Sequence, residues 1–262
     1  MTGFLLAIEG IDGSGKGTQA GRLADAARAA GHRVASFSFP RYDDNPFSRA
    51  IAAYLNGELG ALDEVHPQLS ALLYACDRLH ARPELVAALE ENDLVVCDRY
   101  VASNLAHQGA KLAGEERERL VEWLEEVEFG EFALPRPDLV VLLDAPATLA
   151  RELVARKGAR AYTTLEADIH ERDTEHGDAS REVYLELARR GGWRVVAAAD
   201  EHGDAPLEIC QSIEIAAHDH PRSAVVERDS SCQSRSALSI RREVGVTGGA
   251  RAEARLSTER RR

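Results

Sequence analysis

The chain has 262 residues, enough for one well-buried α/β domain, and its 44% hydrophobic and 29% charged residues exclude collagen-like and wholly disordered proteins. A formal net charge of −12 argues against a nucleic-acid partner, because nucleic-acid binders present clustered basic side chains to phosphates. No apolar run approaches the roughly 20 residues of a membrane span, and residues 4–8 are too few for a signal peptide. We therefore expect a cytoplasmic protein without membrane contact, whose four scattered cysteines are buried or incidental thiols.

The chain begins with a βαβ unit. Residues 4–8 form a continuous apolar run of strand length, and the glycine-rich residues 10–17 follow at once. A helical pattern then covers residues 18–30, and residues 33–37 predict the second strand. The opening is thus a strand, a glycine loop, a helix and a strand.

The alternation of strands and helices continues along the chain. Prolines 67 and 83 are expected at first turns of helices or at helix breaks. Because parallel strands need crossover connections and are buried on both faces, the pattern predicts a five-stranded parallel sheet with helices on both faces. Further strands are predicted at 94–97, 139–143 and 193–197, and further helices at 46–56, 67–91, 115–127, 146–157, 180–190 and 206–217.

The carboxyl edge of this sheet is where a ligand is expected, since parallel α/β sheets bind ligands there. Gly10, Pro40, Asp98 and Asp144 all follow directly after a predicted strand. These four positions should therefore meet at one edge.

The pattern changes from about residue 218. Ser and Arg accumulate, and residues 218–262 carry ten Arg against six acidic residues. Polar, charged segments without an apolar face usually stay solvated. We interpret residues 1–217 as one domain and 218–262 as a disordered tail, with a functional basic arm as the alternative.

The strongest motif is Gly10-Ile-Asp-Gly-Ser-Gly-Lys16, which fits a phosphate-binding loop between a strand and a helix. Glycines let successive backbone N–H groups face one anion, the helix adds the positive end of its dipole, and Lys16 reaches the β and γ phosphates. The motif predicts the three-layer fold of P-loop NTPases. The predicted ATP-binding residues are Gly10, Ile11, Asp12, Gly13, Ser14, Gly15, Lys16, Gly17 and Thr18.

A second motif, Asp98-Arg99-Tyr100, directly follows the predicted strand 94–97. A carboxylate there suits the shell of a Mg²⁺ ion that arrives with ATP, and the adjacent guanidinium suits a phosphate. The residue after Lys16 is normally a Ser or Thr that binds magnesium, but here it is Gly17, with Thr18 one position later. We therefore predict Thr18 and Asp98 near the metal, with an indirect contact.

The motifs together resemble those of the thymidylate kinases, a family of P-loop nucleoside monophosphate kinases. The resemblance follows the family's order from residue 4 to about 215. It rests on Ile8-Glu-Gly-Ile-Asp-Gly-Ser-Gly-Lys16, Phe39-Pro-Arg-Tyr42, Tyr54-Leu-Asn-Gly-Glu58, Leu73-Tyr-Ala-Cys-Asp-Arg78, Asp98-Arg-Tyr-Val-Ala-Ser-Asn104 and Leu134-Pro-Arg-Pro-Asp138.

The resemblance implies transfer of the γ-phosphoryl group of ATP to dTMP, giving dTDP and ADP, in a homodimer. It implies that Asp12 faces the acceptor sugar, that Tyr74 stacks on thymine, and that Arg99 holds the acceptor phosphate. A flat aromatic face and paired guanidinium donors suit these roles. The dTMP-binding residues implied are Phe39, Pro40, Tyr74, Arg78, Arg99 and Asn104.

The segment 151–172 lies where the family has its mobile lid. Its cluster of basic residues suits a flap that closes over the transferring phosphates and excludes water. Arg156 and Arg160 are the candidates for contacts to the transition state, beside Lys16, Asp12 and Arg99 as catalytic residues.

Three departures from the family pattern keep other functions open. His107 and His170 stand where aromatic residues are common, and Gly17 follows the loop lysine, so a nucleotide-binding protein without catalysis is one alternative. Another is a kinase for a different monophosphate, since adenylate kinases continue after their lysine as Gly17-Thr-Gln19 does. A scaffold acting through its tail is the third.

Overall fold

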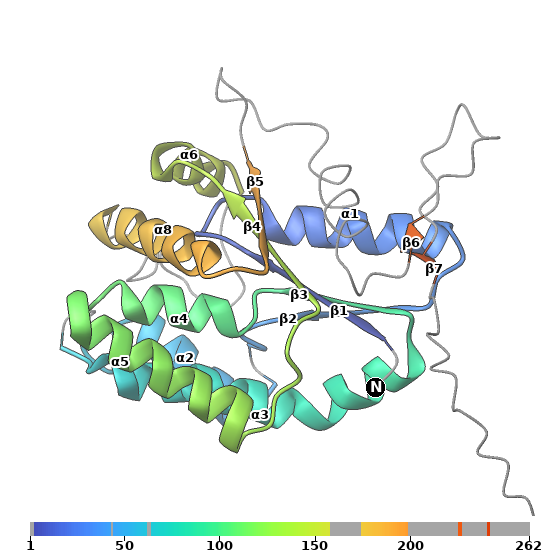
Figure 1. Cartoon of the computed structure of the whole chain (residues 1–262). Helices are drawn as coiled ribbons and strands as arrows, with labels where there is room; N and C mark the ends of the chain where they lie inside the picture. The colour runs from blue at the N-terminus through green and yellow to red at the C-terminus, as the bar shows by residue number, and fades with distance from the viewer. Residues whose placement is uncertain are drawn as a thin grey trace, which may run out of the picture.

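Five parallel strands form the centre of the fold, as the alternating pattern predicts (Figure 1). The computed structural model describes residues 3–42, 44–61, 64–157, 174–198, 225–226 and 240–241. The strands lie in the order β2-β3-β1-β4-β5. They are β1 (Phe4–Glu9), β2 (Val34–Ser38), β3 (Leu94–Asp98), β4 (Leu139–Asp144) and β5 (Trp193–Ala197).

The central strand β1 is buried along its whole length, whereas the edge strands β2 and β5 are only partly covered. This explains why 4–8, 94–97 and 139–143 are continuous apolar runs, since both faces of these strands are buried. In the register of β1 and β3, Ile8 lies opposite Asp98. The residues that follow the two strands therefore meet at the carboxyl edge.

Helices cover both faces of the sheet. In Figure 1, α1 lies on one face, and α4, α5 and α8 lie on the other. The helices are α1 (Lys16–Ala29), α2 (Pro46–Leu55), α3 (Pro67–Glu91), α4 (Val101–Gly109), α5 (Gly114–Glu125), α6 (Ala147–Lys157) and α8 (Thr174–Arg189), and a π-helix, η1 (Glu126–Glu131), continues α5.

One prediction about α3 is wrong, and helix α4 was missed. Pro83 neither starts nor breaks a helix, because α3 runs unbroken through it. The helix packs on α2 and α4, and tertiary packing routinely overrides the cost of an interior proline. Helix α4 was not predicted at all: its N-cap residue, Tyr100, makes no side-chain cap, so no start signal is present in the sequence.

Several boundaries also differ. Helix α8 begins at Thr174 rather than at residue 180, and the helix predicted at 115–127 is instead α5 followed by η1. The predicted helix 206–217 and most of the lid, residues 158–172, lie outside the described residues. The tail 218–262 is described only at β6 (Val225–Val226) and β7 (Ile240–Arg241), which pair antiparallel, so its disorder stays a prediction.

Among the described residues, no helix is both long and apolar enough to cross a bilayer.

Candidate active site

The glycine-rich loop connects β1 to α1 and passes close to α6. A Cβ atom placed on Gly13 would lie 2.0 Å from the carbonyl oxygen of Ala150 in α6, and Gly13 has a φ of 83°, so only glycine fits there. The N-cap of α1 is Gly15, which offers no side chain to its N–H groups. The amino end of α1 is therefore open to an anion, as in other helix N-terminal phosphate sites.

Lys16 is buried at the start of α1. Its Nζ donates a hydrogen bond to the carbonyl oxygen of Ile11 at 2.6 Å. Burial, and to a lesser extent the nearby guanidinium of Arg99, together lower the pKa of this lysine to about 7, although the carboxylates of Asp12 and Asp98 oppose the shift. An ammonium group in this position favours a strongly anionic ligand, because added negative charge restores its protonated form.

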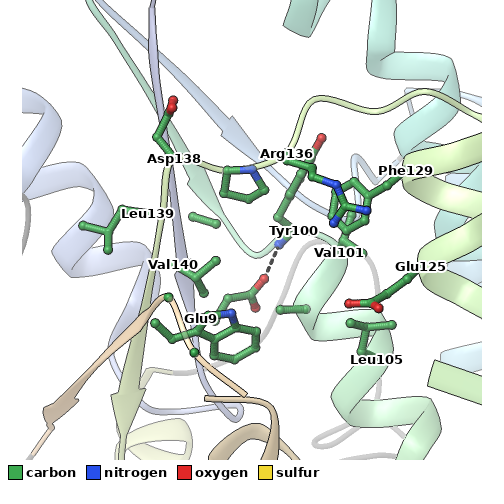
Figure 2. Close-up of a pocket in the computed structure, with 16 residues that line it drawn as sticks. Glu9, Tyr100, Val101, Leu105, Glu125, Phe129, Arg136, Asp138, Leu139 and Val140 are labelled. Atoms are coloured by element: carbon green, nitrogen blue, oxygen red, sulfur yellow. Dashed lines mark hydrogen bonds between the residues drawn. The ribbon is translucent and has the colours of Figure 1, made fainter. Parts of the chain in front are cut away.

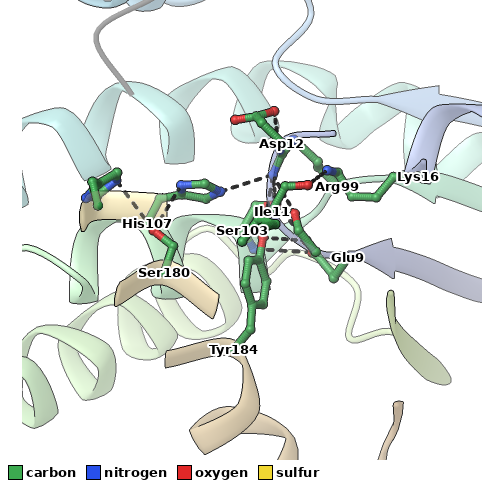
Figure 3. A network of polar contacts seen from close by, with 11 residues as sticks. Glu9, Ile11, Asp12, Lys16, Arg99, Ser103, His107, Ser180 and Tyr184 are labelled. Carbon is green, nitrogen blue, oxygen red and sulfur yellow. Dashed lines mark hydrogen bonds and ion pairs between the residues drawn. The ribbon is translucent and has the colours of Figure 1, made fainter. Parts of the chain in front are cut away.

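Arg99 lies between the loop and helix α4 (Figure 3). Its backbone φ of 67° is unusual for a residue with a side chain. Its Nη2 donates to Asp12 at 2.7 Å, and its Nη1 donates to Ser103 at 2.9 Å and to the carbonyl oxygen of Gly10 at 3.3 Å. Burial alone would lower the pKa of Arg99, but Asp12 and other nearby anionic groups raise it well above its usual value. The Arg99 side chain thus connects the predicted phosphate-binding loop to α4.

A buried carboxylate, that of Glu9, holds the start of α4. Glu9 is fully buried, and its Oε1 accepts the backbone N–H groups of Tyr100 at 2.8 Å and Ser103 at 3.2 Å. Its Oε2 accepts the hydroxyl hydrogens of Ser103 at 2.6 Å and Tyr184 at 3.2 Å. Burial raises the pKa of Glu9, although these hydrogen bonds and Arg99 oppose the shift. Glu9, at the end of β1, therefore supplies the N-terminal cap that α4 lacks in its own sequence.

Asp98, at the end of β3, lies beside the loop. Its Oδ1 is buried and has no hydrogen-bond partner in the described part of the chain. A Cβ atom on Gly17 would lie 2.9 Å from its Oδ2, so glycine at position 17 leaves the carboxylate undisturbed. Thr18 is exposed in the first turn of α1. Of the two predicted metal-site residues, Asp98 is the one with oxygen atoms facing the loop.

Two predicted dTMP contacts, Arg78 and Asn104, are joined by Glu128, which the sequence did not single out. Glu128 is fully buried in η1 and accepts from Arg78 Nε at 2.5 Å and Nη2 at 2.6 Å. It also accepts from Asn104 Nδ2 at 2.8 Å, while the Oδ1 of Asn104 is buried and has no hydrogen-bond partner among the described residues. Burial alone would lower the pKa of Arg78, but Glu128 raises it. Arg78 and Asn104 are thus brought together, and their contact with a base stays a prediction.

The other predicted acceptor residues lie between β2 and α3. Phe39 is 2% exposed and packs against Phe37 and Tyr100, and a cis peptide bond joins it to Pro40. Tyr74 on α3 is half-buried beside Tyr54. Phe39 belongs to the main hydrophobic core, so its part in the acceptor site, with that of Pro40, stays a prediction, as does a stacking role for Tyr74.

The loop after Pro40 is anchored by Asp77 of α3, which is fully buried. Its Oδ2 accepts the backbone N–H of Arg41 at 3.0 Å, and its Oδ1 accepts Asn45 Nδ2 at 2.7 Å. The loop is therefore held at both of its ends, through the backbone of Arg41 and the side chain of Asn45.

The lid candidates are only partly described. Arg156 lies in α6, but its side chain is not described, and Arg160 lies outside the described residues. Asp144, which was predicted at the carboxyl edge, binds Arg181 of α8 through a two-pronged ion pair of 2.6 and 2.9 Å. This pair ties the middle of α8 to the end of β4.

A cavity of about 400 Å³ lies apart from the loop, where β4 and β5 begin (Figure 2). Trp193, Leu139 and Leu105 help to line it, and Arg136 stacks 4.2 Å from the ring centroid of Phe129. None of residues 10–18 lines this cavity. It is therefore distinct from the predicted phosphate site.

The residues that sequence reasoning missed are chiefly buried polar groups: Glu9, Asp77, Ser103, Glu128 and Tyr184. One signal was available, since a carboxylate between the apolar run 4–8 and a glycine loop is unusual in a buried setting. The partners of Glu128 and Tyr184 come from segments distant in the sequence. Periodicity gives no sign of such pairs.

The loop, the buried lysine and the strand order together define a P-loop protein that binds the phosphates of a nucleotide. The family model for thymidylate kinase matches residues 8–209. The chain is 39% identical to a thymidylate kinase of Mycobacterium tuberculosis over 204 residues, covering 76% of this chain and 94% of that one. It is 37% identical to a thymidylate kinase of Caulobacter vibrioides over 206 residues, covering 78% and 91%.

The chain belongs to the thymidylate kinase family and is a phosphotransferase. A solved thymidylate kinase of Candida albicans has the same fold, with a TM-score of 0.61 at 22% identity over 83% of this chain and 92% of that one. The family and the fold suggested by the sequence motifs are thereby confirmed.

Proposed function

We propose that this chain transfers the γ-phosphoryl group of ATP to dTMP, giving dTDP and ADP. The observation that carries the proposal is the position of Arg99. Its guanidinium contacts Asp12 and Gly10 of the donor loop on one side and Ser103 of α4 on the other. A guanidinium at this junction suits the phosphate of the acceptor, which must lie in line with the γ-phosphate of ATP.

On the donor side, the loop binds the phosphates and Lys16 bridges them. The backbone N–H groups at the start of α1 and the helix dipole favour negative charge. Lys16 now donates to Ile11 and would exchange this carbonyl for phosphate oxygens. Phosphoryl transfer needs alignment and charge neutralisation rather than a nucleophilic side chain, and these groups supply both.

Magnesium is proposed as the ion that accompanies ATP. The described residues contain no cluster of three or more His, Cys, Asp or Glu side chains that forms a complete metal cage. Mg²⁺ usually binds through one or two carboxylates together with substrate phosphates and water. The unpaired Oδ1 of Asp98 beside Gly17 fits this mode, as a direct ligand or through a water. The ion would neutralise charge on the donor oxygens.

On the acceptor side, Arg78 and Asn104 read the base, Tyr74 stacks on it, and Asp12 faces the sugar. Glu128 fixes the first two before any ligand binds. A guanidinium and an amide offer donors and acceptors to the polar edge of a pyrimidine. Arg156 and Arg160 would close over the phosphates from the lid.

A homodimer in the cytoplasm is part of the proposal. Large apolar side chains on α2 and α3 support an interface there: Phe47 is 37% exposed, Leu69 62% and Leu79 37%. Light scattering coupled to gel filtration tests the dimer, and a monomer at micromolar concentration would contradict it.

A coupled ADP-release assay tests the reaction. We expect turnover with dTMP to exceed that with AMP, dCMP and dUMP. We expect Lys16→Ala to reduce turnover with dTMP by about 10²-fold or more, while the variant remains folded in the absence of nucleotide. The Gly17-Thr-Gln19 run favours adenylate as the second candidate acceptor, so faster turnover with AMP would replace dTMP. ATP binding without any ADP release would indicate a protein without catalysis.

A further inference from the structure

We propose that His107 is a positioning residue: its neutral imidazole accepts a hydrogen bond from Arg99 and holds that guanidinium for the acceptor phosphate. The inference rests on the proposed function, because it concerns how Arg99 is kept in place. It assigns a role to a histidine at a position where aromatic residues are common in the family.

The hydrogen-bond geometry fixes the protonation state. Nη1 of Arg99 lies 3.2 Å from Nε2 of His107. A guanidinium has only donors, so Nε2 must be the acceptor and carry no hydrogen. In the neutral ring the hydrogen is then on Nδ1, which lies 3.4 Å from Oγ of Ser180 in α8. The ring therefore connects Arg99 to α8 (Figure 3).

The packing fixes the orientation of the ring. The ring of Tyr184 meets that of His107 edge-on, with centroids 5.9 Å apart and an interplanar angle of 89°. The ring of His176 lies 5.8 Å away, and its Nε2 is 3.5 Å from the same Ser180 hydroxyl. Both neighbours come from α8, which packs directly on α4. His107 is thus held by one helix and aimed at Arg99.

Protonation would break this arrangement. An imidazolium has a hydrogen on both nitrogens, so it cannot accept from Arg99, and it adds a second positive charge beside the guanidinium. Among the described residues, the titratable and charged groups around the ring include Arg99 with its partner Asp12, His176 and Tyr184 of α8, and Glu9, which is linked through Ser103 and Tyr184. With a protonated His107 ring, Arg99 would be held mainly by Asp12 and Ser103.

The test compares two substitutions of His107 across pH 5.5 to 8.5. His107→Gln keeps an acceptor that does not titrate, whereas His107→Phe keeps a ring without an acceptor. At pH 8 we expect the KM for dTMP of the Phe variant to rise about 10-fold, the scale of one lost hydrogen bond to a charged group, and that of the Gln variant to stay within about 3-fold. The KM for ATP should change little in either.

The pH dependence separates positioning from packing. At pH values where nitrogen-15 spectra show a protonated His107 ring, the KM for dTMP of the wild type should rise relative to that of His107→Gln, and this ratio cancels the titration of dTMP and of Lys16. His80→Gln, at an exposed site on α3, is the control and should follow the wild type. Nitrogen-15 spectra of the His107 ring at pH 8 should show the hydrogen on Nδ1.

Two results would overturn the inference while the wild type still phosphorylates dTMP. One is a His107→Phe enzyme with an unchanged KM for dTMP, and the other is a hydrogen on Nε2 in the ring spectra. KM profiles for dTMP that stay parallel for the wild type and His107→Gln while the ring protonates would refute it equally. A wild type that is inactive with dTMP would instead remove the proposed function, and with it the premise of the inference.

Discussion

Replacing Glu128 by Gln should weaken both the fold and the binding of the acceptor. The carboxylate is fully buried and receives three donors, two from Arg78 and one from Asn104. Removing one partner of a buried ion pair costs about 3 to 5 kcal/mol, because the other charge stays buried. Asp77 also acts on Arg78, so its charge compensates in part and favours the lower figure, about 3 kcal/mol.

The assay for this variant combines urea and thermal unfolding with steady-state kinetics. A loss of about 3 kcal/mol corresponds to a fall in Tm of about 6 to 12 °C for a domain of this size. We expect the KM for dTMP to rise about 10-fold or more, since Arg78 and Asn104 lose their common anchor, while the KM for ATP changes little. Glu126→Gln, at an exposed position of the same π-helix, is the matched control.

Two outcomes would refute this reasoning in different ways. A loss of stability below about 1 kcal/mol would mean that removing the carboxylate does not leave the Arg78 charge buried and unpaired. A full loss of stability with an unchanged KM for dTMP would mean that Arg78 and Asn104 support the fold but do not contact the acceptor.

The remaining predictions concern the loop and the first turns of α1. Gly17→Ala places a Cβ atom 2.9 Å from Asp98 Oδ2 and should raise the Mg²⁺ concentration needed for half-maximal turnover several-fold. Gly21→Ala, in open space on the same helix, is the control and should leave this concentration unchanged. An equal Mg²⁺ requirement in both variants would show that Asp98 does not contact the metal. The pKa of Lys16 in the folded chain, about 7, lies below the roughly 10.4 of an unfolded chain. Between these values the unfolded state binds more protons, so the free energy of unfolding should rise with pH from about 7 to 10 relative to that of Lys16→Met, and parallel curves for the two proteins would contradict the shift.

The central part of the fold could be predicted because its signals are local. Strands at 4–8, 94–97 and 139–143 are continuous apolar runs, and burial on both faces of a parallel sheet requires this pattern. The phosphate-binding loop was also predictable, since its glycines meet steric demands that act within a few residues and against one neighbouring helix. Such local features can be recognised in a single sequence.

Helix α4 and the carboxylates around it could not be predicted for a physical reason. The first N–H groups of α4 are satisfied by Glu9, which is 91 residues distant from Tyr100 in the chain. A cap supplied from another strand gives no start signal in the sequence. Glu128, in the π-helix that continues α5, is similarly paired with Arg78, 50 residues earlier in the chain.

The buried polar groups of this site fall into two kinds, and the difference separates positioning from binding. Burying a carboxylate is costly unless it is paired, and Glu9, Asp77 and Glu128 are each matched by two or more donors from neighbouring segments. These three are satisfied without a ligand and so fix the loops and helices around the site.

The second kind is unsatisfied, and it lies where ligands are proposed to bind. Within the described residues, four buried side-chain atoms have no hydrogen-bond partner: Ser14 Oγ, Asn56 Oδ1, Asp98 Oδ1 and Asn104 Oδ1. Three of them belong to the phosphate loop, the proposed metal contact and the proposed base contact. Since leaving a buried polar atom unpaired costs about 1 to 3 kcal/mol, a ligand that pairs them recovers free energy that the unliganded fold gives up. Saturating ATP, Mg²⁺ and dTMP should therefore raise Tm together by more than the sum of the separate shifts, and strictly additive shifts would argue that these atoms lie in independent sites.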